Sequence, residues 1–358
     1  MLSFYELSYD DLLEYCRRQE LPVASARLLF NWHYKKNQRD VFSHQHLSQA
    51  ARRFFYSHFD FTLPEVHKLQ MSEDKTVKFL FRLADERFIE SVLIPFQGKY
   101  TLCVSSQVGC AMNCSFCYTG QQGFGRHLSA AEIIGQYLQA KTWLTANRPH
   151  EDRILNVVFM GQGEPLHNFD SVKKACRIFL SQHGLSLAAH KITISTSGYL
   201  PGLKRWPGEM PNVNIALSLH SVFNEKRDIL IPINRKYPLI EILPLVDAIP
   251  QGEKRFVTYE YLLIDQLNDT ESDAHATGKT LRGRKAYVNL IPFNSVPGTY
   301  YRRPNIERVE RFKDILESYG IPVTIRTTKG DAILAACGQL NTQAGSAQTV
   351  STVSTTME

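Results

Sequence analysis

The sequence contains no long run of apolar residues. A membrane-spanning helix needs about 18 consecutive apolar residues, and no stretch of the 358 residues approaches that length. The first residues also lack the basic start and apolar run of a secretory signal peptide. We therefore expect a cytoplasmic protein without a membrane partner.

The cysteines do not form an even set. There are seven of them, and without a secretory signal a disulfide framework is not expected. Clustered thiols in such a chain point instead to metal binding or catalysis. Four of the seven lie between Cys103 and Cys117. Cys16 and Cys176 stand alone in helix-like sequence, which favours buried apolar roles for both.

Acidic residues are scarce in two stretches. Residues 27–53 carry six Lys or Arg against one acid, and residues 274–305 carry six more and no acid. Such stretches suit a polyanion, because neutralising phosphates dominates affinity for nucleic acids. A solvated surface is the alternative for either stretch. The basic residues are Arg27, Lys35, Lys36, Arg39, Arg52 and Arg53, then Lys279, Arg282, Arg284, Lys285, Arg302 and Arg303.

The apolar pattern changes twice along the chain. Residues 1–60 have the spacing of amphipathic helices, and residues 76–104 contain strand-like runs separated by turn residues. Strands are then expected at 155–160, 191–195, 213–218, 256–262, 286–291 and 323–326, and helices at 129–143, 171–182, 239–247 and 305–319. This α/β alternation predicts a parallel sheet with crossover helices, forming a partial or full barrel with ligands at the carboxyl ends of its strands.

Three closely spaced cysteines follow a strand pattern. Cys110, Cys114 and Cys117 are separated by three and two residues, and thiolates favour zinc or iron–sulfur clusters. A closed zinc site would need a fourth ligand, from Cys103 or a distant residue. Three cysteines on a four-iron cluster leave one iron open. This spacing, with Phe116 before the last cysteine, resembles the signature of the radical S-adenosylmethionine (SAM) superfamily.

Polar motifs follow several of the predicted strands. The segment 159–165 resembles the motif by which radical-SAM enzymes hold the amino group of methionine, and a carboxylate with exposed carbonyls suits an ammonium group. Side chains for a ribose and a carboxylate end the next strands. Ser, Asn and His also cap ordinary strand–helix turns, which is the alternative for each one alone. The candidate SAM-binding residues are Gly163, Glu164, Ser195, Ser218, Leu219, His220 and Asn294.

The chain resembles one family in particular, the radical-SAM adenine methyltransferases. These methylate carbon 2 of an adenine in ribosomal and transfer RNA, and close relatives methylate carbon 8. The similarity covers most of residues 70–340 and is weaker in the N-terminal helices. It is carried by residues 103–110, 122–128, 231–234, 289–292 and 331–340.

The resemblance implies a fold and its domains. We expect a radical-SAM partial (β/α)6 barrel at residues 99–340, preceded by a helical, RNA-binding accessory domain at 1–62 and a connecting β extension at 63–98. Residues 341–358 are rich in Ser, Thr and Gln and poor in apolar bulk. Such a segment cannot bury a core, so a disordered tail is expected.

The resemblance also implies a mechanism. One SAM places a methyl group on Cys337, and a second SAM, cleaved at the cluster, yields a radical that takes a hydrogen from that S-methyl group. The carbon radical adds to the base, and Cys103 then attacks the sulfur of Cys337 to release the product through a transient disulfide. Glu90 matches the family's general base.

The implied cofactors and partners follow from that mechanism. They are a [4Fe–4S] cluster on Cys110, Cys114 and Cys117, two SAM molecules per turnover, an RNA substrate, and an electron-donor protein such as flavodoxin. A monomer is expected.

Some residues depart from the family pattern. Tyr118, Ala332 and Leu334 replace residues usual in the family, which affects the choice of RNA target and carbon atom more than the radical chemistry. Without the resemblance, Cys337 reads as part of a buried small-residue turn and Glu90 as a solvated edge residue. The alternatives for the whole chain are a paralogue that methylates carbon 8 or another RNA, a non-methylating radical-SAM enzyme, and a metal-stabilised RNA-binding module without activity.

Overall fold

One large sheet organises most of the chain. The computed structural model describes residues 1–151, 153–250, 255–296 and 298–342. Its main sheet has 10 strands in the order β14-β13-β12-β11-β10-β9-β6-β5-β4-β3. From β6 to β14 the neighbouring strands of this sheet run parallel. These are β6 (Lys99–Cys103), β9 (Ile154–Phe159), β10 (Ile192–Thr196), β11 (Asn214–Ser218), β12 (Val257–Leu263), β13 (Ala286–Pro292) and β14 (Val323–Ile325).

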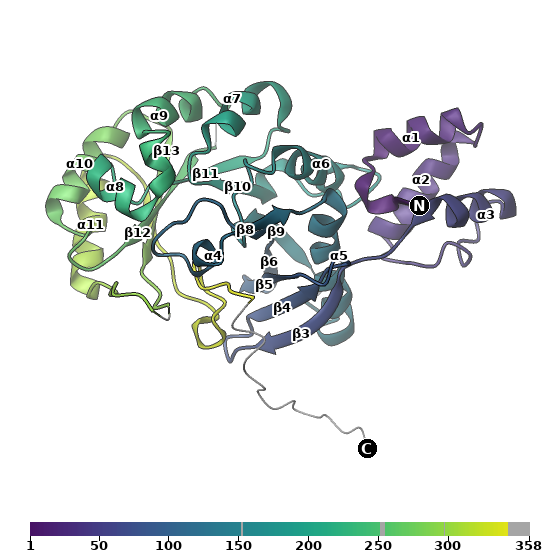
Figure 1. Cartoon of the computed structure of the whole chain (residues 1–358), viewed down its shortest axis with the longest axis horizontal. Helices are drawn as coiled ribbons and strands as arrows, with labels where there is room; N and C mark the ends of the chain where they lie inside the picture. The colour runs from purple at the N-terminus through teal and green to yellow at the C-terminus, as the bar shows by residue number, and fades with distance from the viewer. Residues whose placement is uncertain (152, 251–254, 297, 343–358) are drawn as a thin grey trace, which may run out of the picture.

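Helices connect these parallel strands and cover the sheet (Figure 1). They are α5 (Ala130–Asn147), α6 (Phe169–Leu180), α7 (Leu200–Glu209), α8 (Asn224–Leu230), α9 (Leu239–Asp247), α10 (Glu271–Leu281) and α11 (Ile306–Ser318). Beyond β6 the sheet continues into antiparallel β5 and does not close on β14. The predicted partial barrel is therefore confirmed.

The predicted elements of the barrel agree closely with the observed ones. All six expected strands and four expected helices are present, with ends shifted by a few residues. A capping box starts α5, where the Ser129 hydroxyl accepts the Glu132 N–H and the Glu132 carboxylate accepts the Ser129 N–H. Helices α7, α8 and α10 were not predicted. Two prolines and two glycines in α7 hide its helical pattern.

Three antiparallel strands extend the same sheet. They are β3 (Glu65–Met71), β4 (Val77–Arg82) and β5 (Phe88–Phe96). β5 pairs directly with β6, so the predicted β extension at 63–98 is continuous with the barrel sheet. The division into domains at these boundaries stays a prediction.

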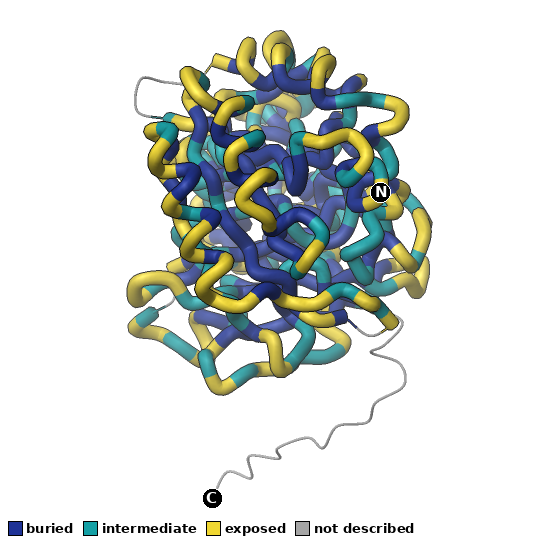
Figure 2. Tube along the Cα trace, turned by 90° about the vertical axis from the view of Figure 1, so that its left-hand side faces the viewer, coloured by how far each residue is buried: buried dark blue, intermediate teal, exposed yellow. Residues whose placement is uncertain are grey.

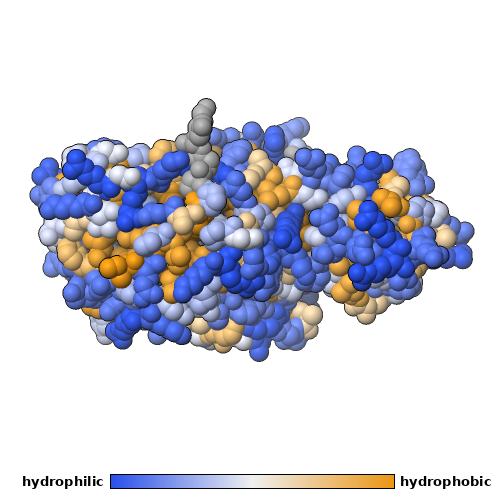
Figure 3. Space-filling view, turned by 90° about the horizontal axis from the view of Figure 1, so that it is seen from above, coloured by the Kyte–Doolittle hydropathy of each residue, from blue (hydrophilic) through white to orange (hydrophobic). Residues whose placement is uncertain are grey.

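The N-terminal helices form a separate bundle at one end of the molecule (Figure 1). They are α1 (Tyr9–Arg18), α2 (Val23–Tyr34) and α3 (Gln49–His58). β1 (Leu2–Ser3) pairs with β2 (Phe59–Asp60) and ties the two ends of this region together. Phe4, Phe30 and Tyr34 are fully buried in its aromatic core. In Figure 3 hydrophilic residues dominate this end, whereas apolar residues gather in the middle of the barrel's visible face.

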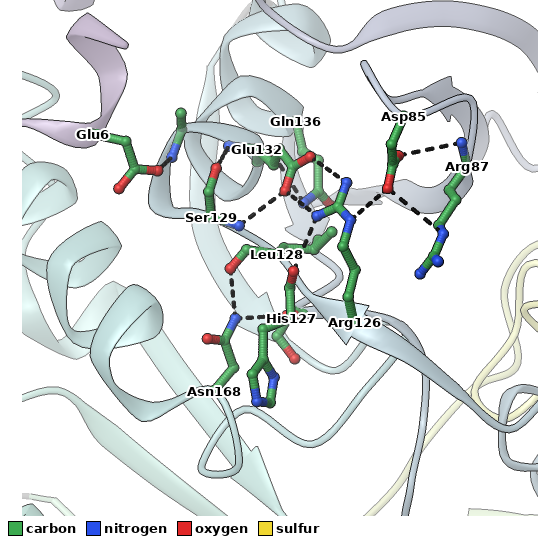
Figure 4. Close-up of polar contacts among 12 residues, drawn as sticks. Glu6, Asp85, Arg87, Arg126, His127, Leu128, Ser129, Glu132, Gln136 and Asn168 are labelled. Carbon is green, nitrogen blue, oxygen red and sulfur yellow. Dashed lines mark hydrogen bonds and ion pairs between the residues drawn. The ribbon is translucent and has the colours of Figure 1, made fainter. Parts of the chain in front are cut away.

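Polar contacts attach this bundle and a small hairpin to α5. The Glu6 carboxylate accepts the Ala131 N–H at 2.8 Å at the start of α5. Arg126 lies between the carboxylates of Glu132 in α5 and Asp85 in the β4–β5 turn (Figure 4). Arg126 belongs to β8 (Phe124–His127), which pairs with β7 (Gln107–Gly109). These contacts fix the hairpin that leads into the cysteine loop.

The apolar core lies along the sheet. Buried segments fill the interior of the molecule and exposed loops surround them (Figure 2). The remaining short elements are α4 (Tyr118–Gln121), η1 (Phe4–Glu6), η2 (Ala189–Lys191), η3 (Pro232–Arg235) and η4 (Asp331–Ile333). In the described part of the chain, no helix has the length and apolarity needed to cross a membrane.

The predicted boundary of the disordered tail, at residue 341, lies too early in the sequence. Asn341 was predicted to begin it, but Asn341 is buried and its N–H donates to Glu90 at 2.8 Å. This bond to a buried carboxylate, together with a bond from Gln122 Nε2 to the Asn341 side-chain oxygen, holds the residue despite the polar sequence that follows. Residues 343–358 lie outside the described residues.

Candidate active site

A short hairpin holds the loop of the three predicted cluster cysteines. Cys110 follows β7, and its N–H donates to the Gly123 carbonyl at 2.8 Å. Gly109 has a φ of 70°, and a Cβ at this position would collide with the Gly123 carbonyl oxygen. Glycine at 109 therefore lets the chain turn from β7 into the cysteine loop.

The three thiols line one cavity of about 160 Å³. Burial raises the pKa of Cys110 to about 12 and also raises the pKa values of Cys114 and Cys117. Without a metal these thiols would stay protonated at neutral pH, but a bound metal deprotonates a coordinating thiol. The implied cluster would therefore itself make the three cysteines thiolates.

The arrangement of the triad suits a cluster. In an iron–sulfur cluster each thiolate binds its own iron, so the sulfurs surround the group and do not converge on one point. Cys110, Cys114 and Cys117 all line one cavity. Within the described residues, no group of three His, Cys, Asp or Glu side chains is placed to hold a single metal ion. The residues present fit the implied [4Fe–4S] group.

The loop after β9 also lines this cavity. Gly163 has a φ of 98°, and a Cβ there would lie 2.5 Å from the Gln107 Cβ. Gln107 also accepts the Glu164 N–H at 2.9 Å. The buried Glu164 carboxylate accepts the Ser197 N–H and hydroxyl, both at 2.8 Å. These hydrogen bonds fix the orientation of the carboxylate. Burial raises the pKa of Glu164, while the hydrogen bonds lower it.

Three more predicted SAM-binding residues line the same cavity. Ser195 and Ser218 come from β10 and β11, and His220 follows β11. His220 Nδ1 accepts the Leu262 N–H at 3.0 Å. Burial, and then the charge of Arg227, lower the pKa of His220 to about 3. The imidazole is therefore neutral and serves as a fixed polar wall.

Two predicted SAM-binding residues lie elsewhere. Leu219 packs in the main apolar core and is absent from the cavity wall. Asn294 lines a second, neighbouring cavity, where its side-chain oxygen accepts the Thr328 hydroxyl at 2.9 Å. Parallel strands bring their ends to one edge of the sheet, but which side chains reach one pocket depends on how each loop turns.

Arg227 was not predicted, yet it joins the ends of β10 and β11. The guanidinium is fully buried. It donates to the carbonyls of Ser197 and Leu219 and to Asn234 Oδ1, at 2.8, 3.1 and 2.7 Å. A fourth bond reaches the Ser218 carbonyl at 3.0 Å. These bonds fix the loops that carry the predicted SAM contacts.

We expect Arg227→Met to destabilise the protein. The change leaves several buried carbonyls without a donor, and each unsatisfied group costs about 1–3 kcal/mol. A loss of at least about 3 kcal/mol in unfolding free energy should follow, measured by anaerobic urea unfolding. Arg235→Met is the control, because Arg235 is exposed in η3. Equal stability of the two variants would contradict this role for Arg227.

A second cavity of about 440 Å³ adjoins the first. Cys103, at the end of β6, lines this cavity, and Cys337 lines both. Polar and apolar side chains share the wall: Phe96, Asn289, Asn294, Thr327 and Thr328. The structure therefore brings Cys337 to Cys103 and the cluster cysteines, from which it lies far away in the sequence.

The segment that carries Cys337 is bound to the helix after the cluster loop. The Tyr118 N–H donates to the Gly338 carbonyl, and the Thr119 hydroxyl donates to the Leu340 carbonyl, both at 2.7 Å. Tyr118 therefore holds this segment through its backbone, a contact that does not depend on its departure from the family pattern. The Cys337 segment is fixed against α4 and the cluster loop.

Arg326 lies beside both cysteines of the second cavity. It ends the predicted strand at 323–326 and lines both cavities. The pKa of Arg326 is raised by nearby groups, most of all by Cys337 and then by Glu260 and Cys103. Burial opposes this and lowers it. Burial in turn raises the pKa of Cys103 to about 12. A search for polar residues at strand ends, applied to this last strand, would have found Arg326.

Glu90 lies outside both cavities. It belongs to β5 and is buried, with Oε1 3.1 Å from Lys78 Nζ. Burial raises the pKa of Glu90, and Lys78 lowers it. Glu90 is therefore not the solvated edge residue considered from the sequence, and its predicted role as a general base stays a prediction. Lys78 was missed, although a lysine within an apolar strand is a recognisable signal.

The basic residues of each of the two stretches lie in different surroundings in the fold. In residues 27–53, Arg39 and Arg52 make internal hydrogen bonds, and the others are exposed. The four basic residues between 279 and 285 precede β13 and so lie at its amino end. Arg302 and Arg303 follow β13, and Arg303 donates to Thr328 at 3.2 Å at the wall of the second cavity. In the second stretch it is thus Arg303 whose contact places it at the edge of the second cavity.

The sequence and fold of this chain are similar to those of known proteins. Residues 104–276 match the Radical SAM superfamily. A protein named dual-specificity RNA methyltransferase RlmN from Desulfotalea psychrophila is 39% identical over 351 residues, covering 95% of each chain. Its namesake from Campylobacter fetus subsp. fetus is 42% identical over 354 residues, covering 95% of this chain and 98% of the relative. The crystal structure of a radical SAM methyltransferase from Sphaerobacter thermophilus has a TM-score of 0.87 and 36% identity, covering 95% of this chain and 99% of that one.

Proposed function

The chain belongs to the family of radical-SAM RNA methyltransferases, and from this premise we propose that it methylates carbon 2 of an adenosine through a thioether on Cys337. It is a SAM-dependent RNA methyltransferase. The proposed substrate is ribosomal RNA, together with transfer RNA. We also infer a cytoplasmic monomer that receives electrons from a flavodoxin-like donor protein.

The position of Cys337 supports the proposal most directly. Cys337 lines both cavities. The first holds the cluster cysteines with Gly163 and Glu164, and the second holds Cys103. A thiol at this junction can receive a methyl group on one side and pass its carbon to a base on the other. The proposal therefore uses two SAM molecules per turnover, one as methyl donor and one as radical source.

The residues around the junction have distinct roles in this proposal. When bound, the [4Fe–4S] cluster supplies the electron for reductive cleavage of SAM. Glu164 orients the amino group of SAM, and Ser195, Ser218 and His220 line the pocket around it. Arg326 places a positive charge beside Cys337, which favours the thiolate that accepts a methyl group.

The second cavity is the proposed site of the adenine. Its wall combines Phe96 with the amide and hydroxyl groups of Asn289, Asn294 and Thr328. Such a mixture suits an unstacked base, which is bound by aromatic contact and hydrogen bonds to its edge. Cys103 in this wall is the proposed partner of Cys337 in product release.

Deleting the gene should remove 2-methyladenosine from ribosomal RNA and transfer RNA, because this chain is the proposed source of that methyl group. Digested RNA from deletion and parent strains is compared by mass spectrometry against standards of both methyladenosine isomers. The control is the deletion strain that again expresses the intact gene. Loss of 8-methyladenosine instead would overturn the carbon-2 assignment. Unchanged amounts of both isomers would overturn the proposed function.

A further inference from the structure

A buried ion pair joins two neighbouring strands next to the Cys337 segment. Lys78 in β4 and Glu90 in β5 are 3.1 Å apart, and their side chains are only 9% and 3% exposed. Burying two charges carries a large desolvation cost, and apolar residues of similar size often replace such pairs without loss of stability. Stability alone is therefore a weak reason for this pair.

The pair holds both ends of the segment that carries Cys337. Lys78 Nζ donates to the Leu334 carbonyl at 3.3 Å, and Glu90 Oε2 accepts the Asn341 N–H at 2.8 Å. Leu334 and Asn341 flank Cys337 on its two sides. Each bond crosses more than 250 positions of sequence, 256 for the first and 251 for the second. Leu334 also has a φ of 51°, an uncommon conformation for a leucine, which directs the turn at this end.

Another bond, from the β3–β4 hairpin, supports the same segment. The Gly330 N–H donates to Asp74 Oδ2 at 3.0 Å, just before η4. The β extension thus contacts the segment at Gly330, Leu334 and Asn341, while α4 contacts it at Gly338 and Leu340. Cys337 is held between these two supports. The β extension is therefore part of the apparatus that sets the position of this thiol.

We propose that Lys78 is a positioning residue that, through its ion pair with Glu90, clamps the two ends of the Cys337 segment and fixes the Cys337 thiol at the junction of the two cavities. This inference rests on the proposed function of Cys337 as methyl carrier. It also gives Glu90, which lies outside both cavities, a function in the protein alone: its carboxylate binds the Cys337 segment.

The first test measures methyl transfer to Cys337 in the cluster-loaded enzyme. SAM is added anaerobically to the wild type, Lys78→Met and Lys75→Met, and methylation of tryptic peptide 330–358 is followed by mass spectrometry. Lys75 is the matched control, because it is an exposed lysine of the same hairpin. We expect Lys78→Met to lower the maximal rate about 100-fold, as a thiol misplaced by about 1 Å would. The KM for SAM should change much less than the rate, since Lys78 lines neither cavity.

Lys78→Arg provides the rescue. It keeps the positive charge and should restore much of the rate, whereas a role in packing alone would favour Met over Arg. Equal rates for the wild type and Lys78→Met would overturn the inference. If the wild type itself never acquired a methyl group on Cys337, the proposed function would fail instead, so the two failures are distinguishable.

The second test does not depend on activity. Hydrogen–deuterium exchange of the cluster-loaded protein is compared for the wild type, Lys78→Met, Glu90→Gln and the double variant. We expect both single changes to speed exchange across 330–341 and the double variant to add little, because the two residues act as one unit. Exchange in the rest of β4 and β5 reports whether each variant is folded. Unchanged exchange at 330–341 in both folded single variants would contradict the clamp.

Discussion

Cys337→Ala should lower RNA methylation by at least about a thousand-fold while reductive cleavage of SAM continues. Alanine has no thiol to receive the first methyl group, so no carbon can be delivered to the base. The proposed SAM pocket should remain, because Gly163, Glu164 and the cluster cysteines line it besides Cys337. Methyladenosine in a substrate RNA and 5′-deoxyadenosine from SAM are measured in the same anaerobic reaction.

The matched control for this variant is Cys176→Ala. Cys176 is fully buried in α6 and lines neither cavity, so this change makes a similar loss of volume away from the site. We expect Cys176→Ala to keep both reactions. If Cys337→Ala methylated RNA at a rate near that of the control, the proposed role of Cys337 as methyl carrier would be wrong. Loss of both products would show instead that the variant has lost its cluster or SAM site.

Cys103→Ala should trap the enzyme on its RNA as a covalent adduct. In the proposed release step the Cys103 sulfur bonds to the Cys337 sulfur, and the bond from that sulfur to the carbon on the base breaks. The carbon keeps the electron pair and takes up a proton, which leaves a methyl group on the base and a disulfide in the protein. Without Cys103 the attack cannot occur, so turnover should stop after one event.

The adduct can be measured directly. On a denaturing gel the variant should migrate as a protein–RNA conjugate that nuclease digestion shortens, and a peptide containing Cys337 should carry a nucleotide. The wild-type enzyme should show little of this species. Burial raises the pKa of Cys103 to about 12, so release by the wild type should speed up as the pH rises above neutrality. A Cys103→Ala enzyme that turns over repeatedly would contradict the release step.

The local patterns of the sequence predicted much of the fold. Strand and helix periods fixed the alternating elements of the barrel, because the side chains of each element must face one core. The Ser129 capping box and the spacing of Cys110, Cys114 and Cys117 were readable for the same reason, since each motif works within a few residues. Gly163, in the turn after β9, was recognisable for the same reason.

Some features could not be read because their partners are distant in sequence. Lys78 and Glu90 look like residues of two separate strands, yet antiparallel pairing of β4 with β5 brings them together. Arg227 belongs to no motif of the sequence, yet its guanidinium is buried among four carbonyl and amide oxygens. Asn341 looks like the start of a polar tail, yet Glu90 binds its N–H.

The sequence by itself determined the radical-SAM framework, because its motifs are short and each acts locally. Only the tertiary structure decided which residues meet at the reaction centre. The order of strands in the sheet places Cys103 at the end of β6, and the Cys337 segment folds back between α4 and the β extension. Contacts of this kind depend on how the whole chain packs, which no local pattern records.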